Sequence, residues 1–303
     1  MNVAHLHLLL NHVPTVGFGV GCGLFVASLL GKSEDLKRAS LVVFFIIALL
    51  AIPAYVTGNS ASFALRDDPA VSQALVTAHQ DAAMLALVAM EVTGLVAWAA
   101  LWRSRRRSLA ALLVLSILTF ALMARAAVVG GQIRHPEILA EGTAAFAPAW
   151  PRAAAMGAAL VLDHPWVWPI CEIFHFVGLC LLFGVVLLVN LRLLGFITGV
   201  AFADVHRLLP WAMGGLSINI VTGMLFFLAA PDQYTQNTAF FWKMGLIFIG
   251  GLTLLYPTIS EEVKALKPDA RASITARIMA VGSILLWVGI IFLGRFLPYI
   301  GSE

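Results

Sequence analysis

Hydrophobic residues fall along the chain in long blocks that are separated by short polar stretches. The blocks cover residues 8–30, 39–58, 76–102, 108–130, 166–194, 207–230, 239–260 and 274–297. Most are close to the ~20 residues that an α-helix needs to cross the hydrocarbon core of a bilayer. A transmembrane β-barrel would show short segments of alternating polarity instead. The pattern therefore predicts an all-α polytopic membrane protein with about eight transmembrane helices.

The composition agrees with this interpretation. Of the 303 residues, 61% are hydrophobic and 12% are charged, whereas an ordinary soluble domain has about 25% charged residues. The formal net charge is +3, and no basic block lies away from the membrane flanks. Nothing therefore indicates nucleic-acid binding. The partner that the composition indicates is the lipid bilayer.

Lys and Arg residues are concentrated in alternate loops. The loops that follow the first, third, fifth and seventh blocks contain most of them, and the densest group is WRSRRRS at 102–108. The opposite side of the membrane carries Arg66, Arg134 and Arg152. Because positively charged loops stay in the cytoplasm, we expect both termini in the periplasm. The protein is then a multi-pass protein of a bacterial inner membrane.

The longest connection between blocks, about residues 131–165, lies on the periplasmic side of this topology. Its prolines and tryptophans are typical of short helices that lie at the membrane interface rather than cross it. The connection divides the chain into three parts. These are a four-helix membrane domain at 1–130, the interfacial connection at 131–165 and a second four-helix membrane domain at 166–303.

The predicted topology places almost all histidines near the periplasmic face. They are His5, His7, His12, His79, His135, His164 and His175. Histidines favour interfaces because an apolar ring carries a polar tip, which explains single cases. The clustering on one side, with three of these residues inside the blocks, favours a ligand-binding role.

Two of these histidines, His12 and His79, lie near the starts of their blocks, at a similar predicted depth in the membrane. In the first block, Gly19 and Gly23 return to within about 20° of the face of His12, since helix residues turn by about 100°. In the third block, His79 stands above alanines on its own face. Two imidazoles on separate helices, with smooth surfaces beneath them, suit the axial ligation of a haem. The sequence predicts a haem b bound by His12 and His79, with Gly19 and Gly23 admitting the ring.

Two alternatives remain open for this segment. The pairs Gly17/Gly21 and Gly19/Gly23 are overlapping G-x-x-x-G motifs, which pack helices in lipid without any cofactor. The histidines are also suitable ligands for another metal.

Arg125 and His175 extend the prediction. Arg125 lies about one helical turn from the outer end of the fourth block, where its partner is either a haem propionate or the lipid head groups. His175 follows Glu172 by one turn in EIFHFVG. We expect one haem b in the first half, and His175 is a candidate metal ligand of a second site that would hold a second haem.

Two alternatives stay open for the second half. It is a degenerate copy without a haem, with Lys243 where a partner ligand would lie, or it recruits His135 or His164 from the outer connection.

Motifs of both halves resemble known families. The first half contains an H-x-x-x-x-H-x-P element, formed by His7, His12 and Pro14, and His79 in TAHQDAA. It resembles an uncharacterised bacterial family of four-helix membrane domains, and this resemblance implies haem-binding histidines. The second half contains HFVGLCLLFG, NLRLLG and LPWAMGGLSINIVTGMLFF. It is similar to another uncharacterised bacterial membrane family and, remotely, to CopD-type copper-resistance domains.

These observations lead to three hypotheses of different classes. The first is a membrane-integral b-type cytochrome, a non-catalytic electron-transfer subunit that links the quinone pool to a periplasmic electron carrier or to other redox subunits. The second is a metal permease of the copper type. The third is a cofactor-free scaffold subunit of a membrane complex. An optical spectrum of the purified protein separates them, because a haem is coloured and its bands depend on its axial ligands.

Overall fold

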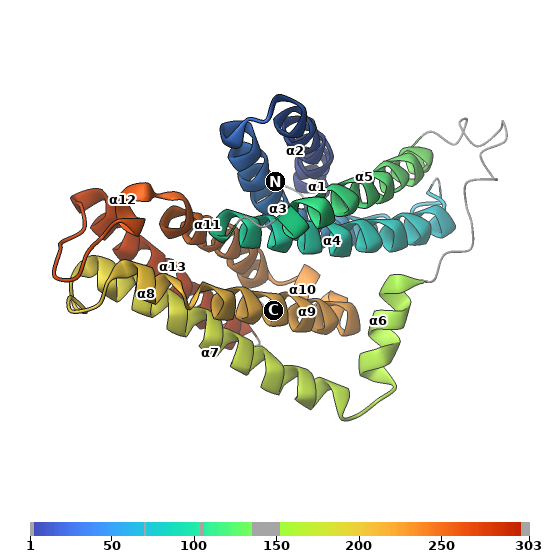
Figure 1. Cartoon of the computed structure of the whole chain (residues 1–303). Coiled ribbons are helices and arrows are strands. Elements are labelled where there is room, and N and C mark those ends of the chain that lie inside the picture. Colours follow the sequence, from blue (N-terminus) through green and yellow to red (C-terminus); the bar gives the residue numbers. More distant parts are fainter. Residues whose placement is uncertain (1–2, 70, 104–105, 135–151, 298–303) are drawn as a thin grey trace.

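The computed structural model describes residues 3–69, 71–103, 106–134 and 152–297 (Figure 1). All its regular elements are helices, and no strand occurs among the described residues. Eight of the helical segments are long and apolar enough to cross a membrane. The predicted all-α, multi-pass architecture is therefore confirmed.

The described residues form thirteen helices. They are α1 (Val3–Leu10), α2 (His12–Gly31), α3 (Glu34–Ala64), α4 (Gln73–Trp102), α5 (Arg106–Arg134), α6 (Ala153–Leu162), α7 (Val167–Leu194), α8 (Phe202–His206), α9 (Leu209–Ala229), α10 (Pro231–Thr235), α11 (Thr238–Ile259), α12 (Glu261–Lys264) and α13 (Ile274–Phe296). The first membrane segment combines α1 with α2, and the sixth combines α8 with α9. The short helix α6 belongs to the predicted interfacial connection, of which 135–151 lie outside the described residues.

The helical hydrogen bonding of the first membrane segment is interrupted near Asn11, between α1 and α2. Pro14 has no N–H group and so cannot donate to the carbonyl of Leu10, four residues earlier. The backbone stays helical through Asn11, whose amide still donates to the His7 carbonyl at 2.8 Å, so α1 and α2 form one membrane segment that lacks only one hydrogen bond. Because His7 and His12 are five residues apart, they point about 140° from each other around this segment.

Side chains at the helix starts explain where the long helices begin. Ser33 Oγ accepts a hydrogen bond from the Leu36 amide at 3.3 Å, and Ser72 Oγ accepts one from the Leu75 amide at 3.4 Å. Each bond satisfies an N–H group that the first turn of a helix leaves unpaired. These caps fix the starts of α3 and α4, the two helices that carry most of the first half's core.

The two halves share their core. The rings of Phe45 (α3) and Trp98 (α4) pack at 5.2 Å between centroids, and both lie among buried residues of the second half. The Trp98 indole donates to Thr258 Oγ1 of α11 at 3.3 Å. Nearer the other end of α3, the rings of Tyr55 and Phe227 (α9) lie 6.3 Å apart. The two halves, which the connection divides in sequence, thus pack closely together.

Contacts at the end predicted to be cytoplasmic join loops that are distant in sequence. Arg38, at the start of α3, forms an ion pair with Glu261 of α12 at 2.9 Å. The fully buried Arg192 donates from its guanidinium to three backbone carbonyls in the connections after α7 and before α13. These positively charged loops therefore lie at one end of the bundle, as the charge pattern predicts.

The outer surfaces of the long helices are apolar. Val114 and Ile117 of α5 are 67% and 64% exposed, and Leu285 of α13 is 66% exposed. Large apolar side chains exposed in this way along whole helices are unfavourable in water and favourable against lipid. The exterior thus fits the bilayer as the environment of the protein.

Candidate functional site

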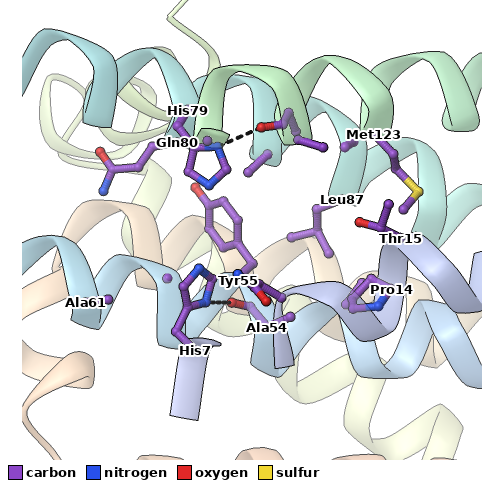
Figure 2. Close-up of a pocket in the computed structure, with 18 of the residues that line it drawn as sticks. His7, Pro14, Thr15, Ala54, Tyr55, Ala61, His79, Gln80, Leu87 and Met123 are labelled. Carbon is purple, nitrogen blue, oxygen red and sulfur yellow. Dashed lines mark hydrogen bonds between the residues drawn. The ribbon is translucent and has the colours of Figure 1, made fainter. Parts of the chain in front are cut away.

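A cavity of about 560 Å³ lies within the first half, lined by residues of α1 to α5 (Figure 2). Its walls include the apolar side chains Val76, Leu87, Met90 and Met123. The volume falls in the range of about 300–1,000 Å³ that is usual for ligand and cofactor pockets. The cavity lies toward the ends of the helices predicted to be periplasmic, the end opposite Arg38.

His7 of α1 forms one wall of the cavity. Its Nδ1 atom lies 3.1 Å from the Ala54 carbonyl oxygen of α3 and 3.3 Å from Thr57 Oγ1. A carbonyl oxygen can only accept, so Nδ1 carries the proton and donates it. In a neutral imidazole the lone pair is then on Nε2. The ring extends from α1 toward the cavity in Figure 2.

His79 of α4 stands on the opposite side with the same arrangement. Its Nδ1 atom lies 3.0 Å from the Ala126 carbonyl oxygen of α5. By the same argument, Nδ1 donates and Nε2 bears the lone pair. Figure 2 shows the rings of His7 and His79 extending into the cavity from opposite walls.

Glycines provide the space that each ring occupies. A methyl group at Gly58 would lie 2.9 Å from Cε1 of His7, and one at Gly130 would lie 2.8 Å from Cε1 of His79. Any side chain at these two positions would therefore displace an imidazole. The bare backbone that the sequence predicts near the histidines is present, but it is provided by α3 and α5.

The two histidine sites are copies of one pattern. His7 and His79 each bond to the carbonyl of the residue 47 positions later. These carbonyls begin the segments AYVTG at 54–58 and AAVVG at 126–130, both of the form Ala-x-Val-x-Gly. The repeat joins residues of two neighbouring blocks, so the periodicity within a single block does not reveal it. The spacing from a histidine to Ala-x-Val-x-Gly is the signal that would have found it.

A polar network borders the cavity beside His79. The Gln80 amide donates to Asn59 Oδ1 at 3.1 Å and to Ser62 Oγ at 2.9 Å. Tyr55 is 7% exposed, lines the same cavity, and has its hydroxyl beside the Asn59 side chain. This hydroxyl can donate to a polar group inside the cavity.

The predicted ligand His12 lies at the margin of this arrangement. It lines the cavity, but the residue is exposed and its Nδ1 is bonded to the side chain of its neighbour Asn11. The structure therefore brings His79 together with His7 on the two walls, while His12 stays at the rim. The role of His12 as a ligand remains a prediction, and the geometry favours His7.

Gly19 and Gly23 do not line the cavity. A methyl group at Gly19 would meet only the ring of Phe120 on α5, at 3.8 Å, and one at Gly23 would have no atom within 4 Å. The bare strip of α2 therefore faces elsewhere. His7 points about 140° away from His12 around this segment, so the face that carries Gly19 and Gly23 is not the face of His7.

Arg125 also lies outside the lining of the cavity. It precedes Ala126, whose carbonyl binds His79, and its Nε and Nη1 atoms are buried. Neighbouring helix residues point about 100° apart, so Arg125 and the acceptor for His79 face different directions. Its pairing with a propionate stays a prediction.

His175 lies in the second half, on α7. Its Nδ1 atom is 2.7 Å from Thr222 Oγ1 of α9, again 47 positions later. The Thr222 hydroxyl donates to the Ile218 carbonyl at 2.7 Å, so its oxygen accepts from His175. The His175 ring packs 5.7 Å from the Phe226 ring. A second site at His175 remains a prediction.

Two further histidines that the sequence places on the periplasmic side, His5 and His164, do not line the cavity. His164 is exposed in the connection before α7, and His135 lies outside the described residues. Within the part of the chain that the structure describes, no group of three or more His, Cys, Asp and Glu side chains could hold a bare metal ion.

Comparisons with protein-family models, with curated proteins and with solved structures found no match. The two family resemblances described above therefore remain predictions, and the case for a function rests on the geometry of the site.

Proposed function

We propose that the cavity between α1 and α4 binds one haem b, with His7 and His79 as axial ligands, and that the protein transfers electrons within the membrane. One observation carries the proposal. Two imidazoles on opposite walls of one cavity each donate Nδ1–H to a main-chain carbonyl, which leaves two Nε2 lone pairs for a ligand between them.

The residues present fit such a group. A haem brings four ring nitrogens of its own, so two imidazoles complete the coordination of its iron. Apolar walls suit the macrocycle, and the network of Gln80, Asn59 and Ser62 offers polar contacts at one edge. Gly58 and Gly130 leave each imidazole in a position that a larger residue would block.

The chain itself orients and tunes the ligands. A hydrogen bond from Nδ1 to a carbonyl fixes the tautomer and ring orientation and makes Nε2 a stronger ligand. Because the acceptors are main-chain atoms of α3 and α5, the orientation is set by helix packing and not by a movable side chain. A bound haem supplies a reversible one-electron change at its iron.

The position of the cavity supports a route for electrons. Lys and Arg residues mark the opposite end of the bundle as cytoplasmic, so the cavity lies toward the periplasm of a bacterial inner membrane. Quinol within the bilayer is the donor that can reach this depth, and a periplasmic carrier or another redox subunit is the acceptor. The protein acts as a relay between them.

The test is an optical titration of the purified protein with haem. We expect a reduced-minus-oxidised spectrum with the bands of a bis-histidine haem in the parent protein. His7→Ala and His79→Ala should abolish it, because each removes one axial ligand. His12→Ala is the matched control, since His12 lines the same cavity from its exposed rim, and it should keep the spectrum.

Two outcomes would contradict the proposal. If His12→Ala loses the bands while His7→Ala keeps them, the ligand pair is His12 and His79. If the protein stays colourless with haem and instead binds copper in a manner that depends on His7, the cavity belongs to a metal permease.

A further inference from the structure

A second, smaller cavity lies where the two halves of the chain meet. Its volume is about 100 Å³, and residues of α3, α4 and α9 line it. The lining side chains are apolar or aromatic except for Glu91 of α4 and Ser217 of α9. A carboxyl group in such a cavity requires an explanation, because ionisable side chains inside a membrane are costly and usually functional.

One oxygen of the carboxyl group of Glu91, the group that could carry a charge, is buried. This oxygen, Oε1, is inaccessible and has no hydrogen-bond partner. The residue keeps some exposed surface, but it lies well inside a membrane-crossing helix, where lipid replaces water. An ionised carboxylate without a partner in such surroundings costs far more free energy than the neutral acid.

Charged groups that could stabilise the carboxylate lie at other depths along the helix bundle. α3 and α9 present no titratable side chain to this cavity. Along α4, Asp81 and His79 are about 15 Å and about 18 Å away by helix rise. Arg125 of α5 lies at the level of His79, and Lys243 of α11 lies against α13. The local environment therefore favours a protonated acid.

Groups in this cavity can accept a hydrogen bond from the acid and exchange its proton. Ser217 Oγ donates to the Met213 carbonyl at 2.9 Å, so its lone pairs are acceptors for the O–H of a carboxylic acid. A water molecule takes up about 30 Å³ of liquid volume, and the cavity is larger than this. We propose that Glu91 is a proton-binding site at the junction of the two halves, and that its proton is linked to the electron in the neighbouring haem cavity.

The link follows from the position of Glu91 and rests on the proposed function. Its neighbour Met90 lines the larger cavity. An electron that reaches the haem from quinol adds negative charge nearby, and this favours protonation of a carboxylate. At a pH alkaline enough to ionise part of Glu91 while the haem is oxidised, one proton that reaches the cavity from bulk water as hydronium then forms an O–H bond on Glu91, and a water molecule is left. When the electron leaves, that bond breaks and the proton returns to water.

The first test is independent of haem. The full-length protein in membranes is treated with dicyclohexylcarbodiimide, a hydrophobic reagent that adds the carboxyl oxygen to its central carbon and the acid proton to its nitrogen. Only a protonated acid reacts. At about pH 8, where an exposed carboxyl is ionised, mass spectrometry should find the adduct on Glu91. It should be absent from Glu91→Gln and unchanged in the matched control Glu172→Gln, which alters an exposed carboxyl.

The second test follows the haem midpoint potential across pH. We expect a pH-dependent potential in the parent protein and a flatter dependence in Glu91→Gln, with the same optical bands. A colourless protein labelled at Glu91 contradicts the proposed function and supports the proton site. A coloured protein without this label overturns the proton site. Labelling with an unchanged pH dependence in Glu91→Gln overturns the link to the electron.

Discussion

His79 in the first half and His175 in the second are held by the same kind of hydrogen bond, but their surroundings differ. Each Nδ1 bonds to an acceptor 47 positions later on the next long helix. For His79 the acceptor is a main-chain carbonyl, and the ring lies in a cavity. For His175 the acceptor is the hydroxyl of Thr222, and the ring packs on Phe226. The pairing of two helices is enough to hold a histidine ring in place. The proposed haem site also needs a second histidine on the opposite wall of the cavity.

The largest effect should separate these two histidines directly. His79→Ala removes one of the two proposed haem ligands, whereas His175→Ala changes a ring outside the cavity. Loss of a partner in the outer shell of a metal site already costs roughly 10–100-fold in affinity, so we expect haem binding in His79→Ala to weaken by about 100-fold or more. A haem titration followed by absorbance measures both. Equal losses in the two variants would show that the second half also holds a required ligand.

The glycines beside the rings sharpen the comparison. Gly58→Ala places a methyl group 2.9 Å from Cε1 of His7, whereas Gly223→Ala places one at 3.8 Å from Cε1 of His175, an ordinary contact. We expect haem affinity to fall by about tenfold in Gly58→Ala, as for a disturbed outer shell, and to stay unchanged in Gly223→Ala.

Thermal unfolding distinguishes this effect from a folding defect. Alanine favours a helix over glycine by about 1 kcal/mol. This gain offsets the free energy of moving the His7 ring, so Gly58→Ala protein without haem should be about as stable as the parent. A large drop in the melting temperature together with the loss of affinity would mean that the substitution damages the fold and not only the site.

Tyr55 marks a difference between the two copies inside the first half. It occupies the second position of AYVTG, where AAVVG has Ala127. Its buried hydroxyl lies beside the side chain of Asn59, so Tyr55→Phe should destabilise the haem-free protein by about 1 kcal/mol. If the hydroxyl donates to bound haem, affinity should fall by about fivefold, the equivalent of one neutral hydrogen bond. Chemical denaturation and the haem titration measure the two effects. Unchanged haem affinity would show that the hydroxyl makes no contact with the group.

The smallest effect concerns the ion pair between Arg38 and Glu261, which joins the two halves at the end predicted to be cytoplasmic. Hydrogen bonds from Arg38, and then from Lys264, lower the pKa of Glu261. A carboxyl whose folded pKa is lowered stabilises the fold above its unfolded pKa, about 4.3. The contribution is lost as pH falls through the lower folded value. Melting temperatures of the parent and Glu261→Gln should differ slightly at neutral pH and converge in acid. A constant difference across pH would exclude this cause.

Much of the fold can be predicted from the sequence, because a membrane-crossing helix needs only length and apolarity. The sequence places His79 near the start of a long helix, and the structure has it there, lining the cavity; its role as a ligand stays a prediction. Which of His7 and His12 extends into the cavity depends on which face of the first segment packs against α3, and the sequence of that segment alone does not specify this. The roles of Gly58 and Gly130 depend on which helices pack together, and the period of a single helix does not contain that information.

The ring contact between Tyr55 and Phe227 has a consequence for the biogenesis of the protein. One wall of the first cavity is supported from behind by α9, which the ribosome makes long after α1 to α5. The early helices can enter the bilayer alone and carry all the described residues that line the pocket, but Tyr55 packs against Phe227 only when the later ones have joined them. If the two halves were made as separate polypeptides, they would have to meet in the membrane before this wall gained its support.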